Sequence, residues 1–148
     1  MECPYGPDLS YSEFGEQLVS KIGNKRVPIS GTVELTERCN LECAHCYINL
    51  PADDQQAQRK ELTYEQWCNI FDQIAEEGCL SLLLTGGEPL LRPDFLDIYA
   101  YAKRKGFIIT LFTNGTMLTP EIADYLQEWP PFLVRSPCME SPRRPTSE

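Results

Sequence analysis

The sequence predicts an α/β fold built around a parallel sheet. Two observations predict it: short apolar or β-branched segments alternate with amphipathic helical segments, and the later repeats of this unit have similar lengths. Strands that alternate with helices indicate a parallel sheet joined by right-handed crossovers. A flat, doubly wound sheet and an open barrel both satisfy this pattern, and the periodicity does not separate them.

Length, charge and cysteine content narrow the class of protein. The chain has 148 residues, seven cysteines and a net charge of −9. It is long enough for one domain but far shorter than the roughly 250 residues of a complete eight-unit barrel. The acidic balance disfavours binding to nucleic acid or to an anionic membrane. With neither a signal peptide nor an apolar run of about 20 residues, we expect a cytoplasmic protein without a membrane segment. So many cysteines in a reducing compartment indicate metal binding or catalysis.

The amino-terminal part of the chain divides into three segments. Residues 1–27 are mixed and polar and show little periodicity, so they form a lead-in to which the sequence assigns no particular structure. Residues 31–36 are short, β-branched and alternating, which is typical of a strand. Residues 37–61 hold three cysteines near their start and a polar tract later, and they predict a long loop.

A helix and a strand follow this loop. Thr63 and Gln66 have the spacing of a capping box, which predicts the start of a helix, and Gly78 is typical of its end. Residues 79–84 are almost continuously apolar, as expected of a strand buried on both faces. The apolar face of the helix would comprise Trp67, Ile70, Phe71 and Ile74.

The same unit then repeats. Pro93 suits the first position of a second helix, which would end at Gly106 before a strand over residues 107–112. Thr119, followed by proline, predicts the start of a third helix, and residues 132–134 predict a fourth strand. The apolar faces of the two helices would comprise Phe95, Ile98, Tyr99 and Ala102, and then Ile122, Leu126 and Trp129.

Three cysteines of the predicted loop, Cys39, Cys43 and Cys46, have the spacing C-x3-C-x2-C. They follow the first strand, and ligands of parallel α/β folds bind outside the carboxyl ends of the strands. Thiolates suit soft metals, so an iron–sulfur cluster and a zinc ion both fit this loop. His45 could complete a zinc site, but it lies between two of the cysteines, and the spacing favours a cluster with one open iron. Metal spacing is lacking for Cys3, Cys68, Cys79 and Cys138.

The run from Thr36 to Tyr47 resembles the cluster loop of radical S-adenosylmethionine (radical SAM) enzymes. Their signature is C-x3-C followed by x2-C, with an aromatic residue next to the middle or last cysteine, and Tyr47 directly after Cys46 fits it. The resemblance implies that Cys39, Cys43 and Cys46 bind a [4Fe-4S] cluster. The open iron would chelate the amino and carboxylate groups of S-adenosylmethionine, and Tyr47 would contact its adenine.

A second match to the family lies at the exit of the second strand. Gly86 and Gly87 permit a sharp turn with exposed backbone groups, and Glu88 and Pro89 follow. A glycine pair is also common in an ordinary βα turn. Radical SAM enzymes carry a G-G-E-P element at this position, and the resemblance implies that these four residues contact the amino group of S-adenosylmethionine.

A third, weaker match follows the third strand. Thr113 and Asn114 precede Gly115, and an Asn-Gly pair is first of all a turn signal. The family often has a T-N-G element here, which implies that Thr113 and Asn114 line the cofactor side of the fold.

The resemblance covers residues 28–134 and implies both a fold and an activity. The fold would be the amino-terminal part of an incomplete, TIM-like (βα)6 barrel with parallel strands, truncated after the fourth strand. The reduced cluster would cleave S-adenosylmethionine to a 5′-deoxyadenosyl radical that abstracts hydrogen from a substrate. A flavodoxin or ferredoxin would donate the electron. The likeness is greatest to members that modify peptides or help to build peptide-derived cofactors, which would make the substrate a peptide.

Two other interpretations fit the same residues. One is a non-enzymatic zinc-binding module that uses the three cysteines and His45. The other is an inactive, truncated fragment of a radical SAM enzyme, because residues 135–148 change character abruptly. That stretch predicts a disordered tail or a shift of the reading frame. Codons for residues 136–141 read in another frame spell a string such as Ile-Ser-Leu-Tyr-Gly-Val, which resembles the fourth strand of the family.

Overall fold

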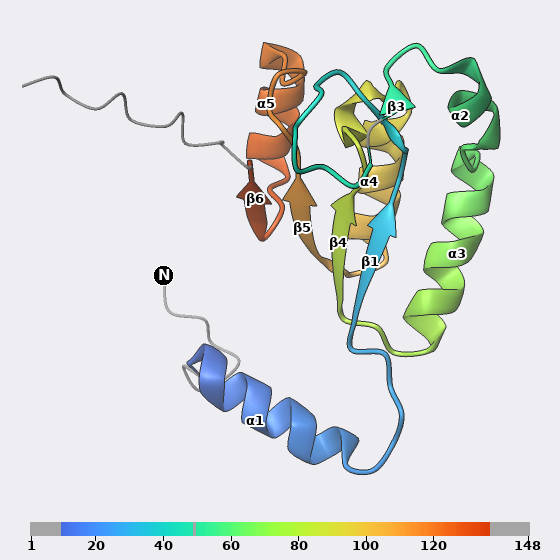
Figure 1. Cartoon of the computed structure of the whole chain (residues 1–148). Coiled ribbons are helices and arrows are strands. Elements are labelled where there is room, and N and C mark those ends of the chain that lie inside the picture. Colours follow the sequence, from blue (N-terminus) through green and yellow to red (C-terminus); the bar gives the residue numbers. More distant parts are fainter. Residues whose placement is uncertain (1–9, 49, 137–148) are drawn as a thin grey trace, which may run out of the picture.

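The computed structural model describes residues 10–48 and 50–136, which form a parallel sheet with helices around it (Figure 1). The strands of the sheet are β1 (Ser30–Glu34), β4 (Ser81–Thr85), β5 (Ile108–Phe112) and β6 (Leu133–Arg135). Two short strands, β2 (Arg38–Cys39) and β3 (Leu50–Pro51), pair with each other. The helices are α1 (Tyr11–Ile22), α2 (Gln55–Lys60), α3 (Tyr64–Glu76), α4 (Phe95–Arg104) and α5 (Pro120–Glu128), with a 3-10 helix, η1 (Pro89–Leu91).

The strand order decides between the two architectures that the sequence left open. The strands lie in the order β1-β4-β5-β6, which repeats their order along the chain, and all three pairs are parallel. Helices α3, α4 and α5 all pack on one face of this sheet (Figure 1). A doubly wound sheet reverses its strand order and carries helices on both faces, whereas a barrel wall does neither. The structure is therefore part of a barrel, as the resemblance implied.

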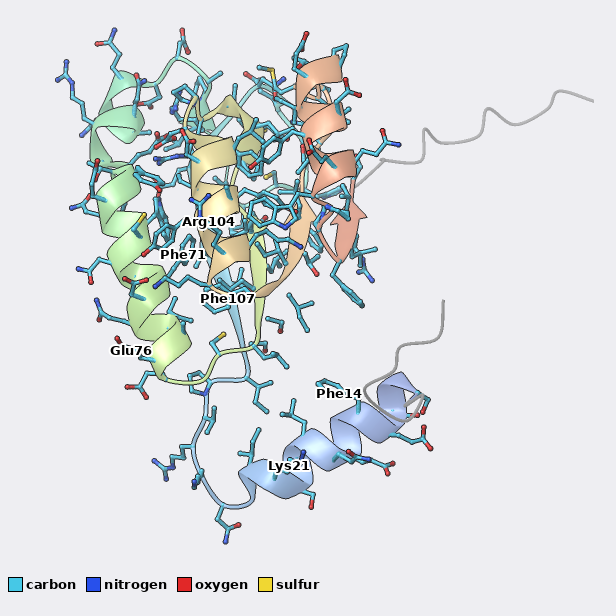
Figure 2. All side chains as sticks on the ribbon, turned by 180° about the vertical axis from the view of Figure 1, so that it is seen from behind. Phe14, Lys21, Phe71, Glu76, Arg104 and Phe107 are labelled. Carbon is cyan, nitrogen blue, oxygen red and sulfur yellow. The ribbon has the colours of Figure 1, made fainter. Side chains whose placement is uncertain are left out.

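The core lies between the sheet and these three helices. Alternate strand residues point into it, and aromatic side chains of the helices meet them there. Phe71 of α3 stacks on Trp67 with ring centroids 5.7 Å apart and meets Phe107 edge-on at 6.0 Å (Figure 2). The strand residues on this face are fully buried: Leu82, Leu84, Ile109 and Leu111.

The expectation that residues 79–84 are buried on both faces is wrong. Leu82 and Leu84 are buried, but Ser81, Leu83 and Thr85 are only half-buried. Helices α3, α4 and α5 cover one face of the sheet, and the residues of β4 that point to the other face are buried less deeply. A nearly continuous apolar run therefore does not distinguish a strand covered on both faces from a barrel strand covered on one.

Two segments contain structure that the sequence analysis missed. The sequence analysis assigned no structure to residues 1–27, whereas residues 11–22 form α1, whose start carries a complete capping box between Ser10 and Glu13. The expected loop over residues 37–61 contains β2, β3 and α2, and the side chain of Asp54 caps α2. In both helices the missed signal is a short polar N-cap residue, Ser10 before α1 and Asp54 before α2.

The bounds of the other helices and strands agree closely with those predicted from the sequence. Thr63 and Gln66 form the predicted capping box of α3, and Thr119 caps α5. Pro93 differs in detail: it precedes the N-cap residue Asp94 instead of occupying the first helical turn. The fourth strand extends to Arg135, so residue 135 belongs to the sheet; the rest of the predicted tail from residue 137 onward lies outside the described residues. No helix in the described part of the chain is long and apolar enough to cross a membrane.

A polar contact between α3 and the end of α4 leads to a prediction about acid stability. Asp72 accepts hydrogen bonds from Lys105 Nζ (2.6 Å) and from the hydroxyl of Tyr101 (2.8 Å). The bond from Lys105, followed by that from Tyr101, holds the pKa of the Asp72 carboxyl below its ordinary value. The contact therefore stabilises the fold above the unfolded-state pKa of this aspartate and loses that effect as the pH falls through the lower folded-state pKa.

We therefore expect Asp72→Asn to lower the melting temperature slightly at neutral pH and to converge with the wild-type chain in acid. Thermal melts of both proteins across the acidic range measure this difference. Asp124→Asn, which removes an exposed carboxylate on α5, serves as the control. A difference between wild type and Asp72→Asn that persists unchanged into strong acid would contradict the prediction.

Candidate functional site

Three connecting segments meet beyond the carboxyl ends of the strands (Figure 1). They follow β1, β4 and β5, and together they line a pocket of about 140 Å³. The wall of this pocket includes all three cysteines of the predicted cluster loop and two residues from each of the other predicted elements. These residues are Cys39, Cys43, Cys46, Gly86, Gly87, Thr113 and Asn114.

Gly86 and Gly87 bring the segment after β4 against the backbone that leads into the cysteine loop. Gly87 N–H donates to the carbonyl of Thr36 (2.8 Å), and Glu88 N–H donates to that of Arg38 (2.8 Å). A Cβ at Gly86 would collide with the Thr36 carbonyl oxygen, and one at Gly87 with the Arg38 carbonyl oxygen. Gly86 also has a φ of 137°, which L side chains rarely adopt. Only glycine therefore allows these two segments to lie this close together.

The carboxylate of Glu88 lies in the interior and joins the segments after β4 and β5. Glu88 has no exposed surface. Its Oε1 accepts hydrogen bonds from the Thr113 hydroxyl (2.7 Å) and Leu90 N–H (3.0 Å), and its Oε2 accepts one from Asn114 N–H (2.6 Å). Glu88 and the buried Pro89 do not line the pocket, so Glu88 acts on it by holding Thr113 and Asn114 in place.

Replacement of Glu88 by glutamine tests this bracing role with almost no change of shape. An amide nitrogen in place of one carboxylate oxygen would face a donor, so at least one buried N–H or O–H group would lose its acceptor. We expect Glu88→Gln to lower the free energy of unfolding by about 1–3 kcal/mol. Urea denaturation measures the loss, with Glu128→Gln on the exposed surface of α5 as the control. Equal stability of the two variants would contradict the bracing role.

The three thiols line the same pocket but do not converge on one point. The Cys46 thiol donates to the carbonyl of Ile48 (2.7 Å), whereas Cys39 Sγ accepts from Leu41 N–H (3.4 Å). Among the described residues, no three histidine, cysteine, aspartate or glutamate side chains are gathered closely enough to hold a metal ion. Cys43 and Cys39 are half-buried and Cys46 is exposed, so the loop could turn its thiols toward a ligand without opening the core.

Tyr47 lies apart from the pocket. Its side chain is 83% exposed, and its hydroxyl donates to Glu34 Oε1 (2.7 Å) at the end of β1. This bond raises the pKa of Tyr47, because the carboxylate accepts the phenolic proton and disfavours a second negative charge beside it. His45 is also exposed and does not line the pocket.

A buried ion-pair network that sequence reasoning missed supports the start of the cysteine loop. Arg38 directly precedes Cys39, and its guanidinium contacts both carboxylate oxygens of Glu61 (2.7 and 3.2 Å). Arg92 approaches the same carboxylate at 3.5 Å and donates to the carbonyl of Leu35 (3.1 Å). Glu61 also accepts a hydrogen bond from Thr36 (2.5 Å). The network thus joins the exit of β1, the segment before α3 and the segment after η1.

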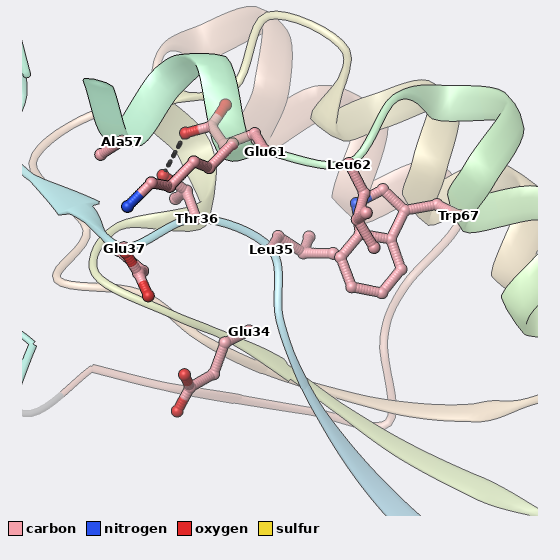
Figure 3. A pocket seen from close by; sticks show the side chains of 9 residues that line it. Glu34, Leu35, Thr36, Glu37, Ala57, Glu61, Leu62 and Trp67 are labelled. Carbon is pink, nitrogen blue, oxygen red and sulfur yellow. Dashed lines mark hydrogen bonds between the residues drawn. The ribbon is translucent and has the colours of Figure 1, made fainter. Parts of the chain in front are cut away.

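A second pocket, of about 230 Å³, lies beside the exit of β1 (Figure 3). Glu34, Thr36, Glu61 and Trp67 are among its lining residues, and the hydrogen bond from Thr36 to Glu61 is drawn in the figure. It contains none of the residues that the sequence analysis assigned to a site. Seven of the predicted site residues therefore line the first pocket, whereas Tyr47, Glu88 and Pro89 line neither pocket.

Comparisons with known proteins agree on one family. The sequence model described as "Radical SAM superfamily" matches residues 33–135. The chain is 43% identical over 94 residues to an AdoMet-dependent heme synthase of Methanosarcina barkeri (strain Fusaro / DSM 804), a match that covers 64% of this chain and 26% of that protein. It is 42% identical over 96 residues to a PqqA peptide cyclase of Streptomyces rochei, covering 65% and 26% respectively. The chain thus spans about a quarter of the length of these curated relatives.

The structural likeness concerns the fold alone. The crystal structure of Streptococcus suis SuiB bound to S-adenosylmethionine superposes with a TM-score of 0.56 at 18% identity, over 85% of this chain and 29% of that one. SuiB bound to the precursor peptide SuiA gives a TM-score of 0.57 at 19% identity over the same shares. The family match spans well over half of the sequence, and on that ground the chain belongs to the radical SAM superfamily.

Proposed function

We propose that this chain forms the cofactor-binding part of a radical SAM enzyme. In this proposal Cys39, Cys43 and Cys46 hold a [4Fe-4S] cluster, and the backbone of Gly86 and Gly87 binds S-adenosylmethionine beside it. The observation that carries the proposal is the shared pocket, to which the cysteine loop, the glycine pair, Thr113 and Asn114 all contribute. Membership of the radical SAM superfamily supports the same assignment.

The donor set fits the proposed group. Three thiols from one loop are soft ligands, and three thiolates on a cubane leave one iron without a protein ligand. When bound, such a cluster supplies the electron that cleaves S-adenosylmethionine and yields a 5′-deoxyadenosyl radical. Binding would require the Cys46 thiol to leave the Ile48 carbonyl and to be deprotonated, a coupling of metal binding to protonation that is general for cysteine sites.

Each remaining residue has a stated task in this proposal. The glycine pair allows the segment after β4 to lie against the start of the cysteine loop and leaves backbone polar groups available to the amino group of S-adenosylmethionine. Glu88 positions Thr113 and Asn114 through its buried carboxylate. Tyr47 remains our candidate for the adenine contact, which would require its hydroxyl to leave Glu34.

A peptide is the substrate class that we propose for the complete enzyme. One relative at 42% identity is named as a peptide cyclase, and SuiB has been crystallised with a precursor peptide. A relative named as a heme synthase is equally similar, but each alignment covers about a quarter of the relative. The rest of each relative lies outside the match, so these identities bear on the shared segment more than on the substrate. A cytoplasmic location and a flavodoxin or ferredoxin as electron donor complete the proposal, since the thiols must stay reduced.

Anaerobic reconstitution of the chain with iron and sulfide tests the proposal. We expect the reduced protein to give the EPR signal of a [4Fe-4S] cluster, and this signal to change when S-adenosylmethionine is added. S-adenosylhomocysteine, which lacks the sulfonium methyl group, is the comparison ligand for the cleavage assay, in which 5′-deoxyadenosine is measured with dithionite as reductant. Retention of zinc in place of iron and sulfide would overturn the proposal in favour of a zinc module. Failure to hold either metal would overturn it as well.

A further inference from the structure

The side-chain amide of Asn114 is fixed by a network of hydrogen bonds. Thr116 N–H donates to Asn114 Oδ1 (2.9 Å), and the Thr116 hydroxyl donates to the same oxygen (2.6 Å). Because a backbone N–H can only donate, this contact identifies Oδ1 and leaves the nitrogen on the other side of the amide. That nitrogen, Nδ2, donates to Asn40 Oδ1 (2.9 Å) and lies 3.7 Å from Cys39 Sγ.

Cys39 stands out among the three cysteines of the pocket. Its sulfur accepts hydrogen bonds from Asn114 Nδ2 and from Leu41 N–H. Cys46, in contrast, uses its thiol as a donor, and within the described ranges the sulfur of Cys43 accepts no hydrogen bond. Two N–H donors therefore point at one of the three sulfurs, that of Cys39.

The backbone of Asn114 is also held in place, by a buried residue that does not line the pocket. Its backbone N–H donates to the buried carboxylate of Glu88, which also binds the hydroxyl of Thr113. Asn40, next to Cys39, donates in turn to Thr116 (2.7 Å). The segment after β5 is thus attached to the glycine-pair segment at one end and to the cysteine loop at the other, with Asn114 at the junction.

We infer that Asn114 is a positioning residue that holds the Cys39 sulfur and, through its N–H···S hydrogen bond, stabilises the reduced form of the cluster. This inference rests on the proposed function. A reduced cluster carries one more negative charge than an oxidised one, so a donor at a ligating sulfur favours the reduced state and raises the reduction potential. Asn114 thereby acts on the electron-transfer step without contacting the substrate.

An EPR-monitored redox titration of the reconstituted chain tests the inference. For Asn114→Ala we expect the ratio of reduced to oxidised cluster at a fixed potential to fall about tenfold, a downward shift of about 59 mV. Asn114→Asp keeps the acceptor for Thr116 but places a negative charge near Cys39, so it should shift the potential further down than alanine does. Asn69→Ala, which removes an exposed amide on α3, is the matched control and should match wild type.

The outcomes separate the inference from the function on which it rests. An intact cluster with the wild-type potential in Asn114→Ala would overturn the inference and leave the proposed function standing. A potential for Asn114→Asp above that of Asn114→Ala would also overturn it, because that order is expected if Asn114 only braces its loop through Thr116. If the alanine variant assembles no cluster, the aspartate variant alone decides, by its potential relative to wild type. A wild-type chain that holds no cluster would overturn the proposed function and the inference together.

Discussion

Alanine in place of Cys39, Cys43 or Cys46 should abolish assembly of the cluster in each single variant. A cubane held by three thiolates loses a whole protein ligand when one thiol is removed, and the described residues that line the pocket include no fourth cysteine to replace it. After anaerobic reconstitution, we expect the iron and sulfide contents to fall from about four of each per chain to near background. Metal analysis and the visible absorption of the cluster measure this loss directly.

The chain provides a matched control for these variants. Cys68 lies on α3, away from the pocket, and is partly exposed like the cluster cysteines. Cys68→Ala should assemble a full cluster, which separates specific ligation from binding of iron to any free thiol. The three cluster cysteines lie outside the hydrophobic core, so circular dichroism of their apo variants should match wild type. Full assembly in any one of the three single variants would remove that cysteine from the ligand set.

The pocket itself could be predicted from the sequence, because three motifs follow three consecutive parallel strands. Carboxyl ends of parallel strands lie at the same edge of a sheet, so residues directly after them come together even when they are far apart in the chain. Cys39, Gly86 and Asn114 meet for this reason. The spacing of the strands predicted the units, and the barrel followed from the strand order once it was known.

The roles of individual side chains within the pocket were harder to predict. The sequence places Glu88 at the end of a strand, where either its backbone or its carboxylate could face a ligand. The structure turns the carboxylate inward, to donors that lie 25 and 26 residues away in the chain. Such long-range pairing depends on the register of β4 and β5, which no local pattern encodes.

The ion-pair network was even harder to predict from the sequence. Arg38, Glu61 and Arg92 come from three separate segments, and each reads in the sequence as an ordinary surface charge. In the structure, however, Arg38 and Arg92 are only 6% and 5% exposed. This burial arises only when the three segments come together in the fold. Charged residues are rarely buried without a partner, so burial and pairing must be established together in three dimensions.

Loss of the Glu61 carboxylate should destabilise the chain by about 3–5 kcal/mol, the usual result of removing one partner from a buried ion pair. In Glu61→Ala, the Arg38 guanidinium would keep only its bond to the carbonyl of Ala52 (2.8 Å) among the described residues, whereas the Arg92 guanidinium would retain Asp94 (2.7 Å). Most of the lost stability would therefore come from the unpaired charge of Arg38, which directly precedes Cys39. Such a loss is a large fraction of the stability of an ordinary domain. Equilibrium urea unfolding measures it.

A double replacement distinguishes the burial of an unpaired charge from a simple loss of contacts. Arg38→Met combined with Glu61→Leu removes both charges and fills a similar volume, so it should be far more stable than Glu61→Ala and close to wild type. If the single and double variants are equally destabilised, the network acts through its shape and hydrogen bonds to the backbone, and the charge argument fails. If the double variant is stable but assembles less cluster, the charges of Arg38 and Glu61 act on the geometry of the loop that begins at Cys39. The same pair of variants therefore separates stability of the barrel wall from organisation of the site that it carries.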